Sequence, residues 1–286
     1  MMVARIARAI GSRNRPRALL ALVISLITIF PIYFMVMGSI SPVEKFLTRD
    51  LGEILIPREV VSEHMAVVAL DPVFARFALN SIIVASATTV ISVVISTLGA
   101  YSLARLRFPG SEALGRFTLL TYTIPSVLLL IPLYKVVVAF NLNNTLISLI
   151  ITYTTFSVPF CLWMLRGYFQ SLPRELEEAA MVDGAGRLGA LFRVVIPLSA
   201  PGIAATALFA FILAWNEFLF ALVFTTTADV KTLPIGVSTT FTAEQTATDW
   251  AVAMSASTLS TIPIFVIVLV LQRWMVRGMT AGSVKG

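Results

Sequence analysis

The most regular feature of this sequence is a series of long apolar runs separated by short polar segments. Six runs approach or exceed the roughly 20 residues that an α-helix needs to cross a bilayer. They cover residues 18–40, 79–104, 115–139, 146–166, 201–225 and 251–276. The pattern therefore predicts an all-α polytopic membrane protein with six transmembrane helices.

Prolines and hydroxyl residues occur inside the apolar runs. The prolines are Pro31, Pro125, Pro132, Pro159 and Pro263. Kinks at these positions are tolerable because neighbouring helices and hydroxyl side chains satisfy the freed backbone groups. The second run also contains Ser81, Ser86, Thr88, Thr89, Ser92, Ser96 and Thr97. Small polar residues of this kind suit close contact between helices, so we interpret most of them as packing residues.

The composition supports a membrane protein and excludes several other classes. Hydrophobic residues make up 58% of the 286 residues and charged residues only 13%, whereas a soluble domain has roughly 25% charged residues. The net charge of +6 does not indicate nucleic acid, because the basic residues lie in short groups between apolar runs. With one cysteine, Cys161, and one histidine, His64, we expect no disulfide, no Cys/His metal site and no catalytic residues.

The distribution of Lys and Arg predicts the orientation in the membrane. With the N-terminus in the cytoplasm, fifteen basic residues fall on the inner side and five on the outer side, which is a clear positive-inside bias. Residues 1–17 are then a cytoplasmic segment, 18–278 the transmembrane domain and 279–286 a cytoplasmic tail. An outer loop covers 41–77. The first apolar run has no cleavage site after it, so we interpret it as an uncleaved span.

The segment 171–198 is too charged to cross the membrane. Its charged residues are Arg174, Glu175, Glu177, Glu178, Asp183, Arg187 and Arg193. Each charge at a helix centre costs about 2.5–3.5 kcal/mol, so the segment is expected in the cytoplasm. Pro173 and the acidic residues after it favour the start of a helix. Gly184 favours its end, and 188–195 a second short helix, which together give a helix-turn-helix.

The same segment contains a glycine pattern typical of dinucleotide sites. Gly184, Gly186 and Gly189 have the required spacing, but the pattern is meaningful only after a β-strand and at the start of a helix within a βαβ unit. Here a predicted helix precedes it, so we interpret the match as coincidence. The sequence also has no phosphate-binding P-loop pattern, so we expect no nucleotide bound by this chain.

The stretch "EEAAMVDGAGRLGALFRVVIPLSAP" resembles the EAA loop of permease subunits of bacterial ATP-binding cassette importers. That family has Glu-Ala-Ala, a Gly four residues after the second Ala, and a hydrophobic-x-hydrophobic-Pro ending. The matching positions are Glu178, Ala179, Ala180, Gly184 and Pro197, with Val194 and Ile196 in place of the usual Ile and Leu. The resemblance implies that this loop docks onto an ATPase subunit, with Asp183 also at the contact.

Two further stretches are similar to the carbohydrate-uptake branch of that family, and to the second permease subunit of maltose-type importers. They are "AWNEFLFAL" at 214–222 and "GMTAGSVKG" at 278–286. The larger outer insertion of the maltose-type subunit is absent here. The resemblance implies a non-catalytic subunit of a bacterial cell membrane importer whose cargo is a sugar, namely a di- or oligosaccharide. It also implies that Ser283 and Lys285 in the tail contact the ATPase.

The implied partners are a homologous second permease subunit, two ATPase subunits, an extracytoplasmic solute-binding protein and the lipid bilayer. ATP and magnesium would bind to the ATPase subunits, and this chain would bind no cofactor. No nucleic acid is expected as a partner.

Glu217 is an ionisable residue within the fifth apolar run, which makes it a functional hypothesis. We predict that Trp215, Asn216, Glu217 and Phe218 line the translocation pathway or the interface between the permeases. The alternative is that Glu217 makes a structural hydrogen bond between helices, and that the aromatic residues only pack.

Two alternatives for the function remain open from the sequence. One is a permease of the same kind for glycerol phosphate or another small polar solute. The other is an ion-coupled secondary transporter, which would need an ion site at mid-membrane and discontinuous helices. Glu217 by itself is weak evidence for such a site.

Overall fold

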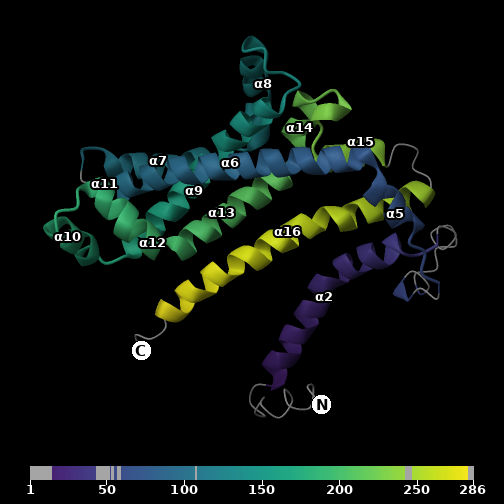
Figure 1. Ribbon diagram of the computed structural model, residues 1–286, viewed down its shortest axis with the longest axis horizontal. Coiled ribbons are helices and arrows are strands. Elements are labelled where there is room, and N and C mark those ends of the chain that lie inside the picture. Colours follow the sequence, from purple (N-terminus) through teal and green to yellow (C-terminus); the bar gives the residue numbers. More distant parts are fainter. Residues whose placement is uncertain are drawn as a thin grey trace. The chain divides into compact units, whose positions relative to one another are not determined.

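The computed structural model of the chain describes residues 15–42, 52, 55–56, 59–106, 108–241 and 247–282, and every regular element in them is helical (Figure 1). The α-helices are α2 Arg15–Ser39, α5 Glu63–Leu70, α6 Pro72–Arg105, α7 Ser111–Tyr122, α8 Leu130–Ala139, α9 Leu146–Ser171, α10 Glu175–Val182, α11 Arg187–Ala190, α12 Ile196–Leu198, α13 Ala200–Trp215, α14 Leu219–Phe224, α15 Leu233–Thr240 and α16 Ala247–Gly282. Two 3₁₀ segments, η2 Ser126–Leu129 and η4 Ala228–Val230, and one π-helical turn, η3 Leu191–Val195, complete the set.

In the described part of the chain, four helices are long and apolar enough to cross a membrane. They are Pro16–Ser39, Pro72–Arg105, Leu146–Ser171 and Trp250–Arg273. Two bent pairs raise the number to six if each pair is one span: Ser111–Tyr122 with Ser126–Ala139, bent by 91°, and Arg187–Leu198 with Ala200–Trp215, bent by 77°. The predicted all-α polytopic fold is confirmed, and six spans is the upper of the two counts.

Two apolar runs that we expected as single helices are broken. The run 115–139 is interrupted between α7 and η2 at Thr123–Pro125. Pro125 has no backbone N–H and also disfavours helical geometry at the residue before it. The run 201–225 is interrupted after Trp215, and the helix resumes at Leu219 as α14. At this second break the Glu217 carboxylate accepts backbone N–H groups at the start of α14, as described below.

The chain forms two compact units, Met1–Asp71 with Val237–Leu259 and Pro72–Gly236 with Ser260–Gly286. In the first unit the end of α2 is held by polar contacts. The Ser255 hydroxyl donates to the carbonyl oxygen of Ser39 at 3.3 Å, and the backbone N–H of Val61 donates to that of Ile40 at 2.8 Å. None of the 18-residue apolar window of α2 is buried. A helix with such a surface needs an apolar surrounding, which the bilayer supplies.

In the second unit α6 packs along α9 and α13. The buried face of α6 is a stripe of small residues spaced three or four apart: Ser81, Ala85, Thr88, Ser92, Ser96, Ala100 and Ala104. Small side chains let neighbouring helices approach closely within a membrane. The Ser96 hydroxyl also donates to the carbonyl oxygen of Val158 in α9 at 3.1 Å. The predicted packing role therefore holds for five of the seven hydroxyl residues, while Ser86 is exposed and Thr89 half-buried.

One end of α6 is fastened to the segment that follows α14. The Asn80 amide donates to the carbonyl oxygens of Asp229 and Lys231 at 2.8 and 2.9 Å. The Ser81 hydroxyl accepts the backbone N–H of Leu233 at 2.7 Å. These contacts are made by side chains of α6 with the backbone of a loop, so they fix the loop whatever its side chains are.

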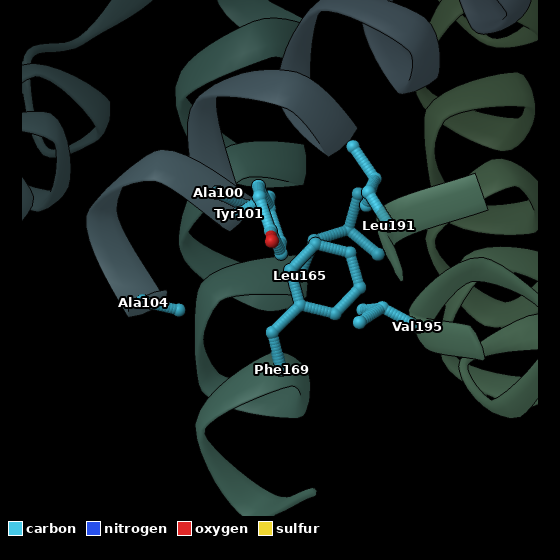
Figure 2. Close-up of a cluster of buried hydrophobic side chains, with 7 residues drawn as sticks. All are labelled: Ala100, Tyr101, Ala104, Leu165, Phe169, Leu191 and Val195. Atoms are coloured by element: carbon cyan, nitrogen blue, oxygen red, sulfur yellow. The ribbon is translucent and has the colours of Figure 1, made fainter. Parts of the chain in front are cut away.

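The other end of α6 joins a hydrophobic cluster from three elements. Figure 2 shows its seven buried side chains: Ala100, Tyr101 and Ala104 of α6, Leu165 and Phe169 of α9, and Leu191 and Val195 of η3. This cluster positions η3, and with it the adjoining α10, α11 and α12. In Figure 1 these short helices lie around this end of α6, away from α14. The cluster therefore holds the predicted helix-turn-helix against α6 and α9.

Candidate functional site

The predicted helix-turn-helix is present as α10, a glycine turn and α11. Helix α10 ends at Val182, and Gly184 adopts a φ of +90°. The N–H of Gly184 donates to the carbonyl of Met181 at 3.1 Å, and that of Ala185 to the carbonyl of Ala180 at 3.0 Å. This pair of hydrogen bonds is the Schellman motif, whose left-handed position glycine occupies at little cost. The prediction that Gly184 ends the helix is confirmed.

The α10–α11 surface exposes most of the residues expected to dock onto an ATPase. Glu178, Ala179, Asp183 and Gly184 are exposed, and Ala180 is half-buried. The structure thus gathers them on one short segment, within two turns of helix and the turn that follows.

Apolar side chains are exposed on the same surface. Val182 is 86% exposed, and Leu176 and Leu188 are also exposed. Helix α10 lies in none of the candidate spans found in the described residues. Exposed apolar side chains beside acidic ones on a polar segment are typical of a contact surface for another protein.

Pro197 lies apart from this surface, in α12. It is exposed and follows the π-helical turn η3. A π-helical turn inside a helix often marks a functional site, and here it precedes the 77° bend between Arg187–Leu198 and Ala200–Trp215. The expected second helix at 188–195 is therefore present as a four-residue α-helix continued by a π-turn.

A buried ion pair behind α10 was not predicted. The Nε atom of Arg105 in α6 lies 3.1 Å from a carboxylate oxygen of Glu177, and the two side chains are only 5% and 9% exposed. Because the Nε atom has no hydrogen-bond partner, this contact is an ion pair rather than a hydrogen bond. The Tyr101 hydroxyl donates a hydrogen bond to the other oxygen of the same carboxylate. Tyr101 and Arg105 lie far from Glu177 in the sequence, so no local spacing indicated the contact.

Glu217 lies at the break in the fifth apolar run and caps the helix that follows. Its two carboxylate oxygens accept the backbone N–H groups of Phe220 at 2.9 Å and Ala221 at 3.2 Å. The start of a helix leaves such N–H groups without partners in the helix, and a negative charge is favourable there. Asn216 acts on the other side of the break, where its side-chain N–H donates to the carbonyl of Ile212 at 2.9 Å.

A cavity of about 670 Å³ opens beside Glu217. It is lined by residues of α7, η2, α9, α13 and α14. Its hydroxyl-bearing residues are Thr121, Tyr122, Thr123, Ser126, Tyr153, Thr155 and Ser157. Phe156 and Phe220 also line it, with ring centroids 5.0 Å apart. The wall thus combines a carboxylate, hydroxyl groups and aromatic faces.

Of the four predicted pathway residues, only Glu217 lines this cavity. Trp215 is 3% exposed and stacks on Phe211 at a centroid distance of 5.5 Å, as a packing residue does. Asn216 and Phe218 are exposed at the break. The predicted tail residues Ser283 and Lys285 lie outside the described residues.

Comparison with known proteins identifies the family and several similar permease proteins. Residues 96–281 match the family described as "Binding-protein-dependent transport system inner membrane component". The chain is 37% identical to the trehalose/maltose transport system permease protein MalG of Thermococcus litoralis, over 93% of this chain and 95% of the relative. It is 35% identical to the diacetylchitobiose uptake system permease protein DasC of Streptomyces coelicolor, with the same two coverages.

A solved structure shares the fold. It is a chain of a bacterial ABC transporter involved in the import of the acidic polysaccharide alginate. The match has a TM-score of 0.77 at 22% identity, and it covers 92% of this chain and 98% of that one.

Proposed function

The chain belongs to the family of binding-protein-dependent transport system inner membrane components, and on this premise we propose that it forms half of the pathway of an ATP-driven sugar importer. Relatives named for the transport of trehalose, maltose and diacetylchitobiose support a saccharide as cargo, and we favour a di- or oligosaccharide. The chain itself is a non-catalytic membrane subunit, and ATP with magnesium binds to partner ATPase subunits.

The observation that carries this proposal is the α10–α11 surface. It is ordered by a Schellman turn, its helix α10 lies in none of the candidate spans, and it exposes Val182 beside Glu178 and Asp183. We assign this surface to the contact with the ATPase. Exposed alanines allow a partner to approach the helix closely, and the carboxylates suit basic side chains on that partner.

In the orientation that we propose, this surface faces the side of the membrane where ATP is available. The excess of Lys and Arg in the segments that share a side with 171–198 supports a cytoplasmic location for the α10–α11 surface and for both termini. The cavity beside Glu217 then belongs to the membrane part of the chain.

We assign the cavity beside Glu217 to the translocation pathway. Sugars present many hydroxyl groups around apolar ring faces, and the cavity wall offers hydrogen-bonding groups together with the rings of Phe156 and Phe220. Glu217 uses part of its hydrogen-bonding capacity for the N–H groups of α14. An ionised carboxylate accepts about four hydrogen bonds, so Glu217 retains capacity for a sugar hydroxyl.

In the proposed cycle, closure of the ATPase dimer displaces the α10–α11 surface. The helices packed on it then rock as rigid elements, and the cavity changes from inward-facing to outward-facing. A homologous permease completes the pathway, two ATPase subunits supply the motion, and an extracytoplasmic binding protein delivers the sugar.

Reconstitution tests this proposal. The complex of this chain with its second permease, ATPase and binding protein is placed in proteoliposomes, with ATP inside and labelled trehalose, maltose, diacetylchitobiose or glycerol 3-phosphate outside. We expect uptake of a saccharide that stops when either ATP or the binding protein is left out.

Two other results would change the proposal, the first in its cargo and the second in its class of transporter. Uptake of glycerol 3-phosphate alone would keep the importer and change the cargo. Uptake by this chain alone, without ATP and driven by an ion gradient, would make it a secondary transporter, for which the broken fifth run with Glu217 would supply the ion site.

A further inference from the structure

Helix α10 is attached to the rest of the chain by an acidic residue. Among its eight residues only Glu177 is buried, whereas a surface helix normally buries an apolar stripe. We infer that Glu177, with Tyr101 and Arg105, forms a rigid joint through which displacement of the α10–α11 surface is transmitted to α6. This inference rests on the proposed contact of that surface with the ATPase, and it names the connection between the contact and the membrane helices.

Both oxygens of the Glu177 carboxylate are held by α6. The Tyr101 hydroxyl donates to one, and the Arg105 Nε lies 3.1 Å from the other. Two contacts from two successive turns of α6 fix the direction of the carboxylate as well as its distance. Because Glu177 is in the first turn of α10, fixing its side chain also fixes the direction of the helix.

The chain on either side of α10 is tied to the same end of α6. Before α10, the Arg105 guanidinium donates to the carbonyl of Leu172 at 3.1 Å, and the Arg174 guanidinium donates to the carbonyl of Ala104 at 3.4 Å. After α10, the Tyr101 hydroxyl lies 3.3 Å from the carbonyl oxygen of Arg187. The joint therefore spans the whole α10–α11 surface, from its first residues to the start of α11.

The anchor on the α6 side is well packed. Tyr101 belongs to the hydrophobic cluster that joins α6, α9 and η3 (Figure 2). A displacement of Glu177 would therefore push against the close-packed ends of the long helices α6 and α9. Closely packed elements move as units between discrete arrangements instead of deforming gradually.

A polar joint differs from an apolar one in directionality. Replacing a buried ion pair by apolar residues of similar volume is often neutral or stabilising, so stability alone does not explain this pair. Apolar contacts hold two surfaces together but permit sliding and rotation, whereas an ion pair with a hydrogen bond fixes one register. Glu177 is thus a positioning residue, which acts through α6 and does not contact the partner or the cargo.

The first test compares two glutamates that each pair with an arginine. Glu177→Gln removes the charge of the joint, and Glu112→Gln makes the same change in the exposed pair of Glu112 and Arg116 in α7, outside the α10–α11 surface. In the reconstituted complex we expect both variants to assemble with the ATPase. Glu177→Gln is expected to lower the solute transported per ATP hydrolysed about fivefold or more, the lower end of common coupling effects. Glu112→Gln should match the parent. An unchanged ratio in Glu177→Gln would overturn the inference.

A second variant separates transmission from stability. Arg105→Met with Glu177→Leu replaces the pair by apolar side chains and leaves no buried charge without a partner. We expect this double variant to assemble and to keep the thermal stability of the parent, yet to keep the low ratio of Glu177→Gln. A parental ratio in the double variant would show that burial alone suffices, and the joint would be rejected.

A distance measurement tests the joint even if the complex transports no sugar. Spin labels are attached at Val182→Cys in α10 and Leu98→Cys in α6, two exposed positions, in a chain whose single cysteine is removed by Cys161→Ala. We expect a narrow distance distribution that stays the same with and without ATP, and a broader one in Glu177→Gln. A distance that changes with ATP in the parent, or the same width in Glu177→Gln, would contradict a rigid joint.

Discussion

Glu177 and Glu217 both lie at junctions between helices, and different groups satisfy their carboxylates. Glu177 is held by the side chains of Tyr101 and Arg105, which belong to another element. Glu217 is held by the backbone N–H groups of Phe220 and Ala221 in the helix that follows it. In the part of the chain that the structure describes, no Lys or Arg side chain forms an ion pair with Glu217.

This difference separates two kinds of task. A carboxylate bound by a distant element ties two parts of the fold together. A carboxylate bound by its own neighbours shapes the backbone locally and keeps hydrogen-bonding capacity for something else. Glu177 therefore belongs to the connection between the α10–α11 surface and α6, while Glu217 opens a break in an apolar run and borders a cavity.

The largest effect on stability is expected when the joint loses its cation. Arg105→Ala leaves the Glu177 carboxylate buried without a charge partner, which typically costs about 3–5 kcal/mol of the free energy of unfolding. The measurement is unfolding of the purified chain in detergent. A cost below about 1 kcal/mol, the range of exposed ion pairs, would mean that the pair is not buried as the structure has it.

The close fit of the surrounding helices is tested at Gly202 in α13. A Cβ atom at this position would lie 2.5 Å from ring carbons of Tyr168, whose side chain packs against the cluster behind the joint. Gly202→Ala is expected to destabilise the chain by about 1–3 kcal/mol through overpacking. Gly167→Ala is the control, since a Cβ there meets nothing within 4 Å. Equal stability of the two variants would show that Tyr168 moves aside freely.

At Glu217 the expected loss of stability is smaller than for Arg105→Ala, and the main expected effect is on sugar uptake. Glu217→Ala removes the acceptor of two N–H groups at the start of α14, a loss of about 1 kcal/mol on the scale of helix caps. We expect uptake by the reconstituted complex to fall while ATPase association stays normal. Glu217→Gln keeps an acceptor for the cap and should recover stability better than uptake. Parental uptake in both variants would favour a purely structural role.

The smallest effects are expected at ion pairs open to solvent. Arg76 and Asp229 lie 3.3 Å apart, with side chains 58% and 80% exposed, and Arg116 and Glu112 form an exposed pair within α7. Such pairs contribute about 0–1 kcal/mol, so Arg76→Ala and Arg116→Ala should leave the unfolding free energy nearly unchanged. A loss comparable to that of Arg105→Ala would remove the distinction between buried and exposed pairs on which the joint depends.

The sequence predicted the features that depend on local pattern. Long apolar runs indicated the spans, Gly184 indicated the end of α10, and the charged residues of 171–198 indicated an exposed polar segment, which holds α10. These signals are carried by neighbouring residues, because helix length, capping and hydropathy are local properties.

The features that depend on contacts between distant residues could not be predicted. Glu177 was noted as charged and Arg105 was counted only among the basic residues, but nothing in their spacing shows that α6 brings them together. The break at Glu217 was also missed, because an apolar run predicts a continuous helix and does not show that the Glu217 carboxylate caps a new one. Trp215 was predicted at the pathway or the permease interface, with packing as the alternative, and it is packed against Phe211.

The central claim is that the α10–α11 surface receives the motion of the ATPase. The most direct measurement is the amount of ATPase subunit that copurifies with Glu178→Lys/Gly184→Arg. Both positions are exposed, and the second also forces a residue with a side chain into a φ of +90°. Glu112→Lys/Gly110→Arg is the control, because it makes the same charge changes at exposed positions outside the α10–α11 surface, and Gly110 also has a positive φ, of +87°.

We predict that the first variant inserts into the membrane but loses the ATPase and ATP-dependent uptake, while the control retains both. Normal association and uptake in the first variant would contradict the account.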